Sequence, residues 1–595
     1  MGVLAGLAAV LILAVAAAAW LGSRASIIKT ELEASNQLIP VLKENVAGNK
    51  QQDATATVAQ LRSHTAAARE AAADPLWTMA SAAPGVGANF SAIAEVARSA
   101  DDVATLGVDP LVKVFEALNW DSMLPNGAGA DLGPIRDASP RVSAAAHAVR
   151  ASAERLSRID ADTLWPQVAE PLRLARQQLQ TVTGALDASA SVAKIAPGMM
   201  GADGQRSYLL MIQNNAEARA SGGIPGALAV LTLDKGKLTL VAQSSAAELG
   251  TMSPVLSVDP EQQQIYSTRL GMYMQDVNLT PDFPTAASTA QAMWEKKTGQ
   301  HVDGVISLDP VALGYVLDAT GPVRTTSPEL LALTKTGLPV ELTGKNVVPT
   351  LLSDVYAKIA RPQLQDVYFA GVAQEIFAAL SSGKGEGKGL IEGLSRGAAE
   401  GRILLWSGAK DEQAVLNNYT VGGAISGPGV APAQFGVYFN DGTGAKMDYY
   451  VKRTAQLVKE CPADGYQRTR VRITSTNTAP ADAATSLPAY VTGAGDFGVP
   501  AGSVRTNVIA YGPVQADVET ASVDGKKAGF AAQQHANRPV GSVTVTLAPG
   551  QSSTVDFSFG RIVQHAEPTV VVTPTVQPVK EVVLATENAV CETSK

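Results

Sequence analysis

The spacing of hydrophobic and polar residues changes character three times along the chain. An uninterrupted apolar run comes first, followed by alanine-rich segments with apolar residues every three or four positions. Alternating strand-like segments then mix with helical ones, and the last quarter alternates with a period of two between regularly spaced turns. This pattern predicts a multidomain α+β protein with four parts: a transmembrane anchor (1–23), a helical stalk or bundle (24–195), an α/β domain (196–428) and a β-sandwich (429–595).

The first apolar run contains no charged residue. Residues 3–22 would span about 30 Å as a helix, and Trp20 stands where an interfacial aromatic is expected. A cleaved signal peptide is the alternative, because the run contains small-residue cleavage patterns, but it lacks a basic leader. We expect a single-pass membrane anchor. Arg24 and Lys29 follow the run, and by the positive-inside rule they favour a cytoplasmic location for the bulk of the chain.

The two cysteines favour the opposite side. Cys461 and Cys591 are 130 residues apart, and they occur in the strand-rich region without a CxxC pair, which argues against zinc. In an exported protein they would form one disulfide, and two unpaired buried thiols are the alternative. We expect the bond and an extracytoplasmic location for the bulk of the chain.

Composition excludes some functions. The chain has 595 residues, 46% of them hydrophobic and 17% charged, which predicts several folded domains. The net charge of −8 and the absence of a basic run argue against nucleic acid as a partner.

Two motif matches carry no chemistry in their context. The segment "GLSRG" (393–397) fits a nucleophile elbow but lies in a helical pattern rather than between a strand and a helix. The segment "GAGDFG" (493–498) fits a dinucleotide-binding loop, yet Pro500 and further strand follow it.

A polar tract at the end of a predicted strand is the first candidate site. The stretch "QNNAEARASGG" (213–223) follows the apolar run "YLLMI", and strand ends in open α/β sheets face the ligand crevice. Arginine binds phosphate or carboxylate in a bidentate manner, and glycines leave backbone N–H groups accessible. We therefore predict an anion site in this tract, made by Asn215, Glu217, Arg219, Gly222 and Gly223.

A second polar loop provides carboxylates. Asp276, Asn278 and Asp282 lie in "MYMQDVNLTPDFP", and Asp276 with Asp282 could hold a divalent cation such as Mg²⁺ beside a bound pyrophosphate. The alternative is purely structural: Arg219 forms an ion pair with Glu217 or Asp282 and locks the two loops together.

Several segments carry a resemblance to a known family. The segments "LLMIQNNAEARASGGIPGALAVLTLDKGKL", "QDVNLTPDFPTAA", "VDGVISLDPVALGYVLDATGPV", "ILLWS" and "AKMDYYV" resemble the actinobacterial family called domain of unknown function 4012. The likeness covers about residues 75–520. It implies a membrane-anchored protein associated with envelope polysaccharide, in a family for which no reaction is established.

The order of elements also resembles the LytR-CpsA-Psr family, which transfers lipid-linked glycopolymers to peptidoglycan. By this likeness Arg219 matches that family's first arginine, and Tyr356, Lys358, Arg361 and Asp366 match positions in a later helix pair. The family's R-S-D is here "SGG", and its "PRD" is "SSAAEL", so much of the arginine–aspartate set is missing. The resemblance implies the fold of the α/β domain, and it brings Arg361 to the anion site.

These observations lead to two functional hypotheses. In the first, an envelope protein binds a polyprenyl-phosphate-linked glycan or a cell-wall polymer through its α/β domain, with phosphotransferase activity as a further step. In the second, the protein is a non-catalytic envelope scaffold with a vestigial crevice. We assign no reaction from the sequence.

Overall fold

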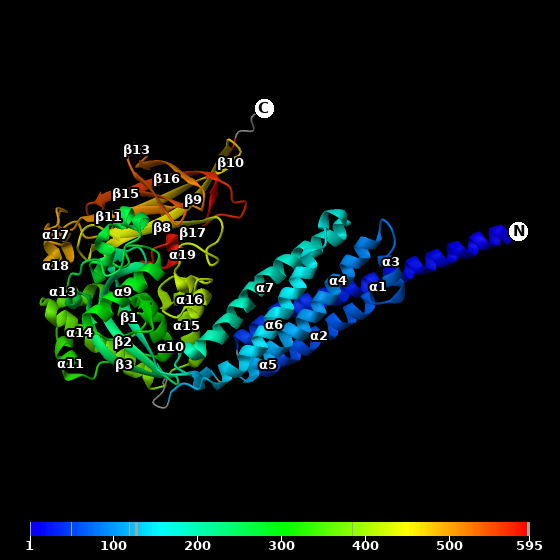
Figure 1. The fold of residues 1–595 in the computed structure, drawn as a ribbon, viewed down its shortest axis with the longest axis horizontal. Coiled ribbons are helices and arrows are strands. Elements are labelled where there is room, and N and C mark those ends of the chain that lie inside the picture. The colour runs from blue at the N-terminus through cyan, green and yellow to red at the C-terminus, as the bar shows by residue number, and fades with distance from the viewer. Residues whose placement is uncertain (1, 49, 118–119, 125–128, 384, 592–595) are drawn as a thin grey trace. The chain divides into compact units, whose positions relative to one another are not determined.

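The computed structural model describes residues 2–48, 50–117, 120–124, 129–383 and 385–591. The chain forms two compact units (Figure 1). The first unit combines Met1–Asn119 with Asp131–Met199, and the second combines Trp120–Ala130 with Met200–Lys595. The predicted α/β and β-sandwich regions therefore both lie in the second unit.

The first unit is helical. Its core consists largely of alanine and other small side chains, which allow helices to approach closely, and α1 packs along α2 while α6 packs along α7. Its helices are α1 (Gly2–Ala47), α2 (Gln51–Ala72), α3 (Pro75–Ser81), α4 (Gly87–Asp102), α5 (Asp109–Ala117), α6 (Gly133–Ser157) and α7 (Pro166–Met199).

The helix α1 contains the expected membrane anchor. Its segment Ile12–Val46 is long and apolar enough to cross a membrane, and 6% of its most apolar window is buried inside the protein. Ile12, Leu13 and Val15 are each more than 60% exposed. The N-terminal part of α1 is apolar and largely uncovered, which supports a single-pass anchor.

The second unit begins with a five-stranded mixed sheet in the order β3-β2-β1-β4-β7. Strands β2 and β3 form an antiparallel hairpin, and Lys235 and Gly236 in its turn have φ of +50° and +74°. Among the described strands of this sheet, β1 and β4 form the one parallel pair. The strands are β1 (Arg206–Arg219), β2 (Gly222–Asp234), β3 (Lys237–Ser245), β4 (Gly304–Leu308) and β7 (Ile403–Ser407).

Helices and a small ladder accompany this sheet. The helix α10 begins with an aspartate cap: Asp309 accepts a hydrogen bond from the backbone N–H of Ala312 at 2.8 Å, and Pro310 opens the helix. The elements are α8 (Pro260–Tyr266), α9 (Phe283–Thr298), α10 (Pro310–Thr320), β5 (Val323–Arg324), α11 (Pro328–Thr334), β6 (Glu341–Leu342), α12 (Val347–Pro349), α13 (Val355–Lys358), α14 (Pro362–Ser381), α15 (Gly387–Ala399) and α16 (Lys410–Leu416).

Two further sheets form the C-terminal part of the same unit. Their orders are β13-β12-β16-β10-β9-β18 and β14-β15-β11-β8-β17, and one buried cluster takes residues from both, including Phe439 and Phe557. The elements are β8 (Gln434–Asp441), β9 (Val451–Ala463), β10 (Tyr466–Asn477), α17 (Ala483–Ser486), α18 (Ala489–Thr492), β11 (Val504–Tyr511), β12 (Asp517–Val523), β13 (Lys526–Ala528), β14 (Ala531–His535), β15 (Arg538–Leu547), β16 (Ser552–Ile562), β17 (Thr569–Val572), α19 (Val579–Val582) and β18 (Glu587–Asn588).

The predicted disulfide is present. Cys461 and Cys591 are bonded, with their Cα atoms 5.5 Å apart. The bond fastens the end of the C-terminal segment, which pairs through β18 with β9. We call residues 573–591 the C-terminal strap.

Candidate site at the end of strand β1

The polar tract forms the end of β1, where the strand no longer pairs regularly with β2. Pairing with β2 shifts between Asn214 and Ala218, so the three residues between them have no partner in β2. The polar groups of this bulge therefore form their hydrogen bonds and ion pairs with elements other than β2. Those partners determine what the tract can do.

The two glycines accommodate the bulge. A side chain on Gly222 would place its Cβ 1.8 Å from Gln213 Oε1, and one on Gly223 would lie 2.2 Å from the backbone of Asn214. The backbone N–H of Gly223 donates to Gln213 Oε1 at 3.0 Å, and its carbonyl accepts from Asn278 Nδ2 at 2.8 Å. Both polar backbone groups of Gly223 are thus used inside the protein.

Arg219 is buried and paired. Its side chain is 8% exposed, and Nη2 lies 3.4 Å from a carboxylate oxygen of Glu217 and 3.4 Å from one of Asp276. Its Nη1 and Nε donate to the carbonyls of Ala218 (3.0 Å) and Gln275 (3.3 Å). This is the structural alternative from the sequence with one change, since Asp276 and not Asp282 is the partner in the second loop.

Lys446, which follows β8, completes the set of charges. Its Nζ donates to Glu217 at 2.5 Å and lies 5.9 Å and 5.5 Å from the ring centres of Tyr356 and Tyr490. Burial alone raises the pKa of Glu217, but the positive charges of Lys446 and Arg219 outweigh burial and lower it. We call Glu217, Arg219, Asp276 and Lys446 the β1 charge cluster.

The tract also bonds directly to the C-terminal sheets. The backbone N–H of Ala218 donates to Asp448 at 2.9 Å, and that of Ala220 donates to Asn440 Oδ1 at 2.9 Å. Beside them lies Asp441, whose pKa is raised to about 7 by burial and by the negative charges of Asp448 and Glu217. The end of β1 therefore lies against β8 and the segment after it.

Asn215 belongs to a second buried group, which holds the C-terminal strap. Its Nδ2 donates to Asp309 (3.2 Å) and to the carbonyl of Pro574 (3.1 Å). Arg402, whose side chain has no exposed surface, pairs with Asp309 at 2.8 Å and donates to the carbonyls of Thr575 (2.8 Å) and Gln577 (2.9 Å). Residues distant in sequence thus meet through charge-assisted hydrogen bonds.

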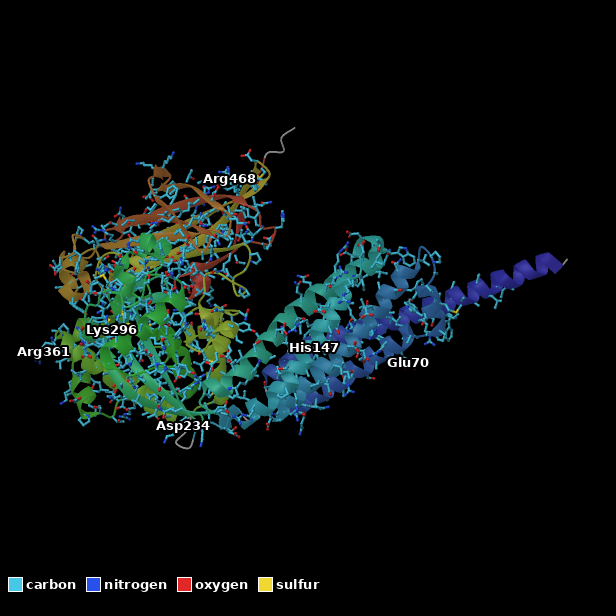
Figure 2. The ribbon with its side chains drawn as sticks, in the orientation of Figure 1. Glu70, His147, Asp234, Lys296, Arg361 and Arg468 are labelled. Carbon is cyan, nitrogen blue, oxygen red and sulfur yellow. A yellow bond between two sulfur atoms is a disulfide. The ribbon has the colours of Figure 1, made fainter. Side chains whose placement is uncertain are left out.

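Two of the predicted residues, Asp282 and Arg361, do not pair with Arg219 in the described part of the chain. Asp282 caps α9, accepting from the backbone N–H and hydroxyl of Thr285 at 3.3 Å and 2.6 Å. Arg361 precedes α14 with an exposed side chain, and Figure 2 shows it at the outer edge of the second unit. Asp276 has Arg269 Nη2 at 2.7 Å in addition to Arg219.

A metal at the predicted position would have to displace existing partners. Both carboxylate oxygens of Asp276 face arginines, and those of Asp282 serve α9 and the backbone N–H of Ile425. Among the described residues no group of three or more His, Cys, Asp or Glu side chains is placed to hold a metal ion.

Of the helix-pair positions taken from the LytR-CpsA-Psr likeness, Tyr356 reaches β1. Its hydroxyl accepts a hydrogen bond from Asn214 Nδ2, while Lys358 pairs with Asp354 at 3.0 Å. Asp366 lies largely at the surface. The part of its carboxyl that is shielded from water and the negative charge of Glu248 both raise its pKa.

Sequence reasoning missed the partners of the tract. Asn440, Lys446 and Asp448 bond to it directly. Asp441 lies beside them, and Arg402 is connected to the tract through Asp309, which accepts from Asn215. Lys446 and Asp448 stand in "AKMDYYV", where a lysine and an aspartate between apolar residues was a usable signal of buried pairing. Nothing local to that segment indicated that its partner lies about 230 residues earlier in the chain.

The fold and site define a multidomain α+β protein with an apolar N-terminal helix and a buried polar joint in its second unit. Residues 203–356 match the family described as "Protein of unknown function (DUF4012)", which confirms the family resemblance over that segment. The matched segment contains Arg219 and Asp276 but ends before Arg402 and Lys446. No curated protein and no solved structure matches the chain.

Proposed function

We propose that this chain is a membrane-anchored, extracytoplasmic envelope protein that acts as a non-catalytic scaffold or interaction protein. The observation that carries this proposal is the pairing of the polar tract inside the molecule. Arg219 faces Glu217 and Asp276, and the backbone around it bonds to β8 and to the segment that follows. An arginine held in this way stabilises a joint and has little left with which to bind a phosphate.

The proposed architecture follows the same lines. The C-terminal sheets form a β-sandwich in this proposal, which the buried cluster drawn from both of them supports. The LytR-CpsA-Psr-like fold of residues 196–428 is proposed on the sequence resemblance. Its crevice would be vestigial, since the end of β1 is occupied by its own chain.

Lipid-phosphate binding tests the scaffold against the alternative of a glycan-binding crevice. Full-length protein would be assayed for binding of a polyprenyl-phosphate-linked glycan. If the protein is a scaffold, we expect the wild type not to bind this glycan. Binding that is lost in Arg219→Ala, with an unchanged melting temperature, would replace the scaffold with an anion site.

The side of the membrane is tested separately. We expect protease added to intact spheroplasts to degrade the chain beyond about residue 30, because the disulfide between Cys461 and Cys591 suits an oxidising compartment. Complete protection of the chain in intact spheroplasts, with degradation after lysis, would place it in the cytoplasm.

One observation on residues outside the β1 charge cluster supports the alternative function, glycan binding. Tyr356 has its ring centre 5.8 Å from Phe369 and 5.9 Å from Tyr490, and Tyr490 is 50% exposed. Exposed aromatic rings offer flat apolar faces on which a sugar ring can stack. Tyr490→Ala should then weaken binding of cell-wall polysaccharide to the full chain, whereas Tyr466→Ala, at a residue 41% exposed on the β9–β10 hairpin, should not.

A further inference from the structure

The first unit meets the anchor without a linker. The uncharged run of α1 continues past Trp20 to Ser23. About two turns after Trp20 the same helix is packed in the bundle, where Ile28 is 2% exposed among small side chains of α2 and α4. The partly buried Leu21 and Ala25 belong to the same packing. The end of the bundle therefore lies close to Trp20 along α1, where the predicted membrane span ends.

The short helix α3 is attached at this level. Asp74 accepts a hydrogen bond from Trp20 Nε1 at 3.2 Å and pairs with Arg24 Nε at 3.2 Å. The same carboxylate caps α3 by accepting from the backbone N–H of Leu76 at 2.9 Å. One aspartate thus links α3 to the last turn of the predicted membrane span.

The surface of α3 and the loop after it is apolar and uncharged. Residues 75–94 contain no Asp, Glu, Lys or Arg, unlike the helices on either side. Met79 is 70% exposed, Leu76 38% and Val86 39%. Trp165, 47% exposed, joins them through Phe90, whose ring centre lies 6.4 Å away.

Figure 1 shows α3 at the end of the bundle from which α1 leaves toward the N-terminus. Tryptophan and other apolar side chains are favoured at the membrane–water interface, and a short helix with exposed apolar residues can lie in that plane. We infer that α3, the loop 82–86 and Trp165 form a membrane-contacting foot that rests in the interfacial layer of the same bilayer that α1 crosses. The foot would fix the bundle against the bilayer, which a single spanning helix does not do.

The inference rests on the proposed anchor, and the experiment separates the two. Full-length protein with its disulfide intact would carry a bimane label on Met79→Cys, in bilayers with and without brominated lipid. Val15→Cys, in the span and 64% exposed, reports on the anchor. Leu106→Cys is the matched control: it is apolar and 53% exposed, but it lies beyond the 16-residue helix α4, about 24 Å further along.

We expect brominated lipid to quench the labels on Val15→Cys and Met79→Cys several-fold more than the label on Leu106→Cys. Quenching at Val15→Cys with water-like behaviour at Met79→Cys would leave the anchor in place and overturn the foot. No quenching at Val15→Cys would instead overturn the anchor. A label on Met79→Cys that is shielded from both water and lipid would show that protein covers this surface, and it would also overturn the foot.

A polar variant provides a second test. Leu76→Ser combined with Met79→Ser removes apolar surface that is already exposed, so the melting temperature should stay close to that of the wild type. A label on Val86→Cys should then lose most of its quenching by brominated lipid. Unchanged quenching at Val86→Cys in this variant would contradict a foot held by α3.

Discussion

The guanidinium of Arg219 lies 3.4 Å from the carboxylate of Asp276, and the two side chains are 8% and 4% exposed. They come from β1 and from the loop before α9, and Glu217 shares the same guanidinium nitrogen. The two carboxylates compensate the positive charge of the buried Arg219 side chain. The pair with Asp276 also connects two segments that are 57 residues apart in the sequence.

Removal of the Arg219 side chain should destabilise the protein. Arg219→Ala leaves Glu217 and Asp276 buried with fewer partners, and we expect a loss of about 3–5 kcal/mol in the free energy of unfolding. Arg269→Ala is the control, because that side chain also pairs with Asp276 but is 58% exposed, and it should cost less than about 1 kcal/mol. Denaturant unfolding of both variants measures the difference, and equal small losses would contradict a structural role.

Arg402 should hold the C-terminal strap. Arg402→Met leaves the buried carboxylate of Asp309 without its cation and frees the carbonyls of Thr575 and Gln577. We expect a loss of about 3–5 kcal/mol and faster proteolysis within the strap. The control Arg396→Met, at an arginine 55% exposed, should leave the cleavage rate unchanged.

Stability should depend on pH through Asp441. Its folded-state pKa of about 7 lies above the ordinary value of 3.8, so between these values the folded chain keeps a proton that the unfolded chain releases. This carboxyl's contribution to stability is therefore lost as the pH rises from about 4 to about 7. Asp441→Asn removes that contribution. As the pH rises across this window, the variant should therefore become more stable relative to the wild type, by up to about 1.4 kcal/mol of unfolding free energy per pH unit. A constant difference between pH 5 and pH 8 would contradict the raised pKa.

The disulfide should stabilise the second unit. It closes a loop of 130 residues, for which loop-closure entropy predicts a contribution of about 4–5 kcal/mol. Cys591→Ser, Cys461→Ser and the double variant should lose similar amounts, since each removes the same bond. Unfolding of the wild type with and without reductant checks the value, and an unchanged transition would show that the noncovalent contacts of the strap hold it without the disulfide.

Some features followed from local sequence. The uncharged run before Arg24 predicted a membrane anchor, because twenty apolar residues without charge are costly to leave in water, and in the described part of α1, 6% of the most apolar window is buried. The turn at Lys235–Gly236 and the cap at Asp309 were equally local, since each depends on the backbone preferences of two or three neighbouring residues. The pairing of Cys461 with Cys591 followed because the chain has no other cysteine.

The contacts of the polar tract were decided only by the tertiary structure. Local sequence placed Glu217, Arg219 and two glycines at a strand end, a pattern that suits an anion site and a buried joint equally well. The choice depends on Lys446, about 230 residues later, and on whether other sheets cover the strand end. Burial turns an arginine from a ligand for phosphate into a partner for carboxylates, because a charge removed from water must be neutralised by groups already in place. Burial is a property of the assembled fold, and no short stretch of sequence contains it.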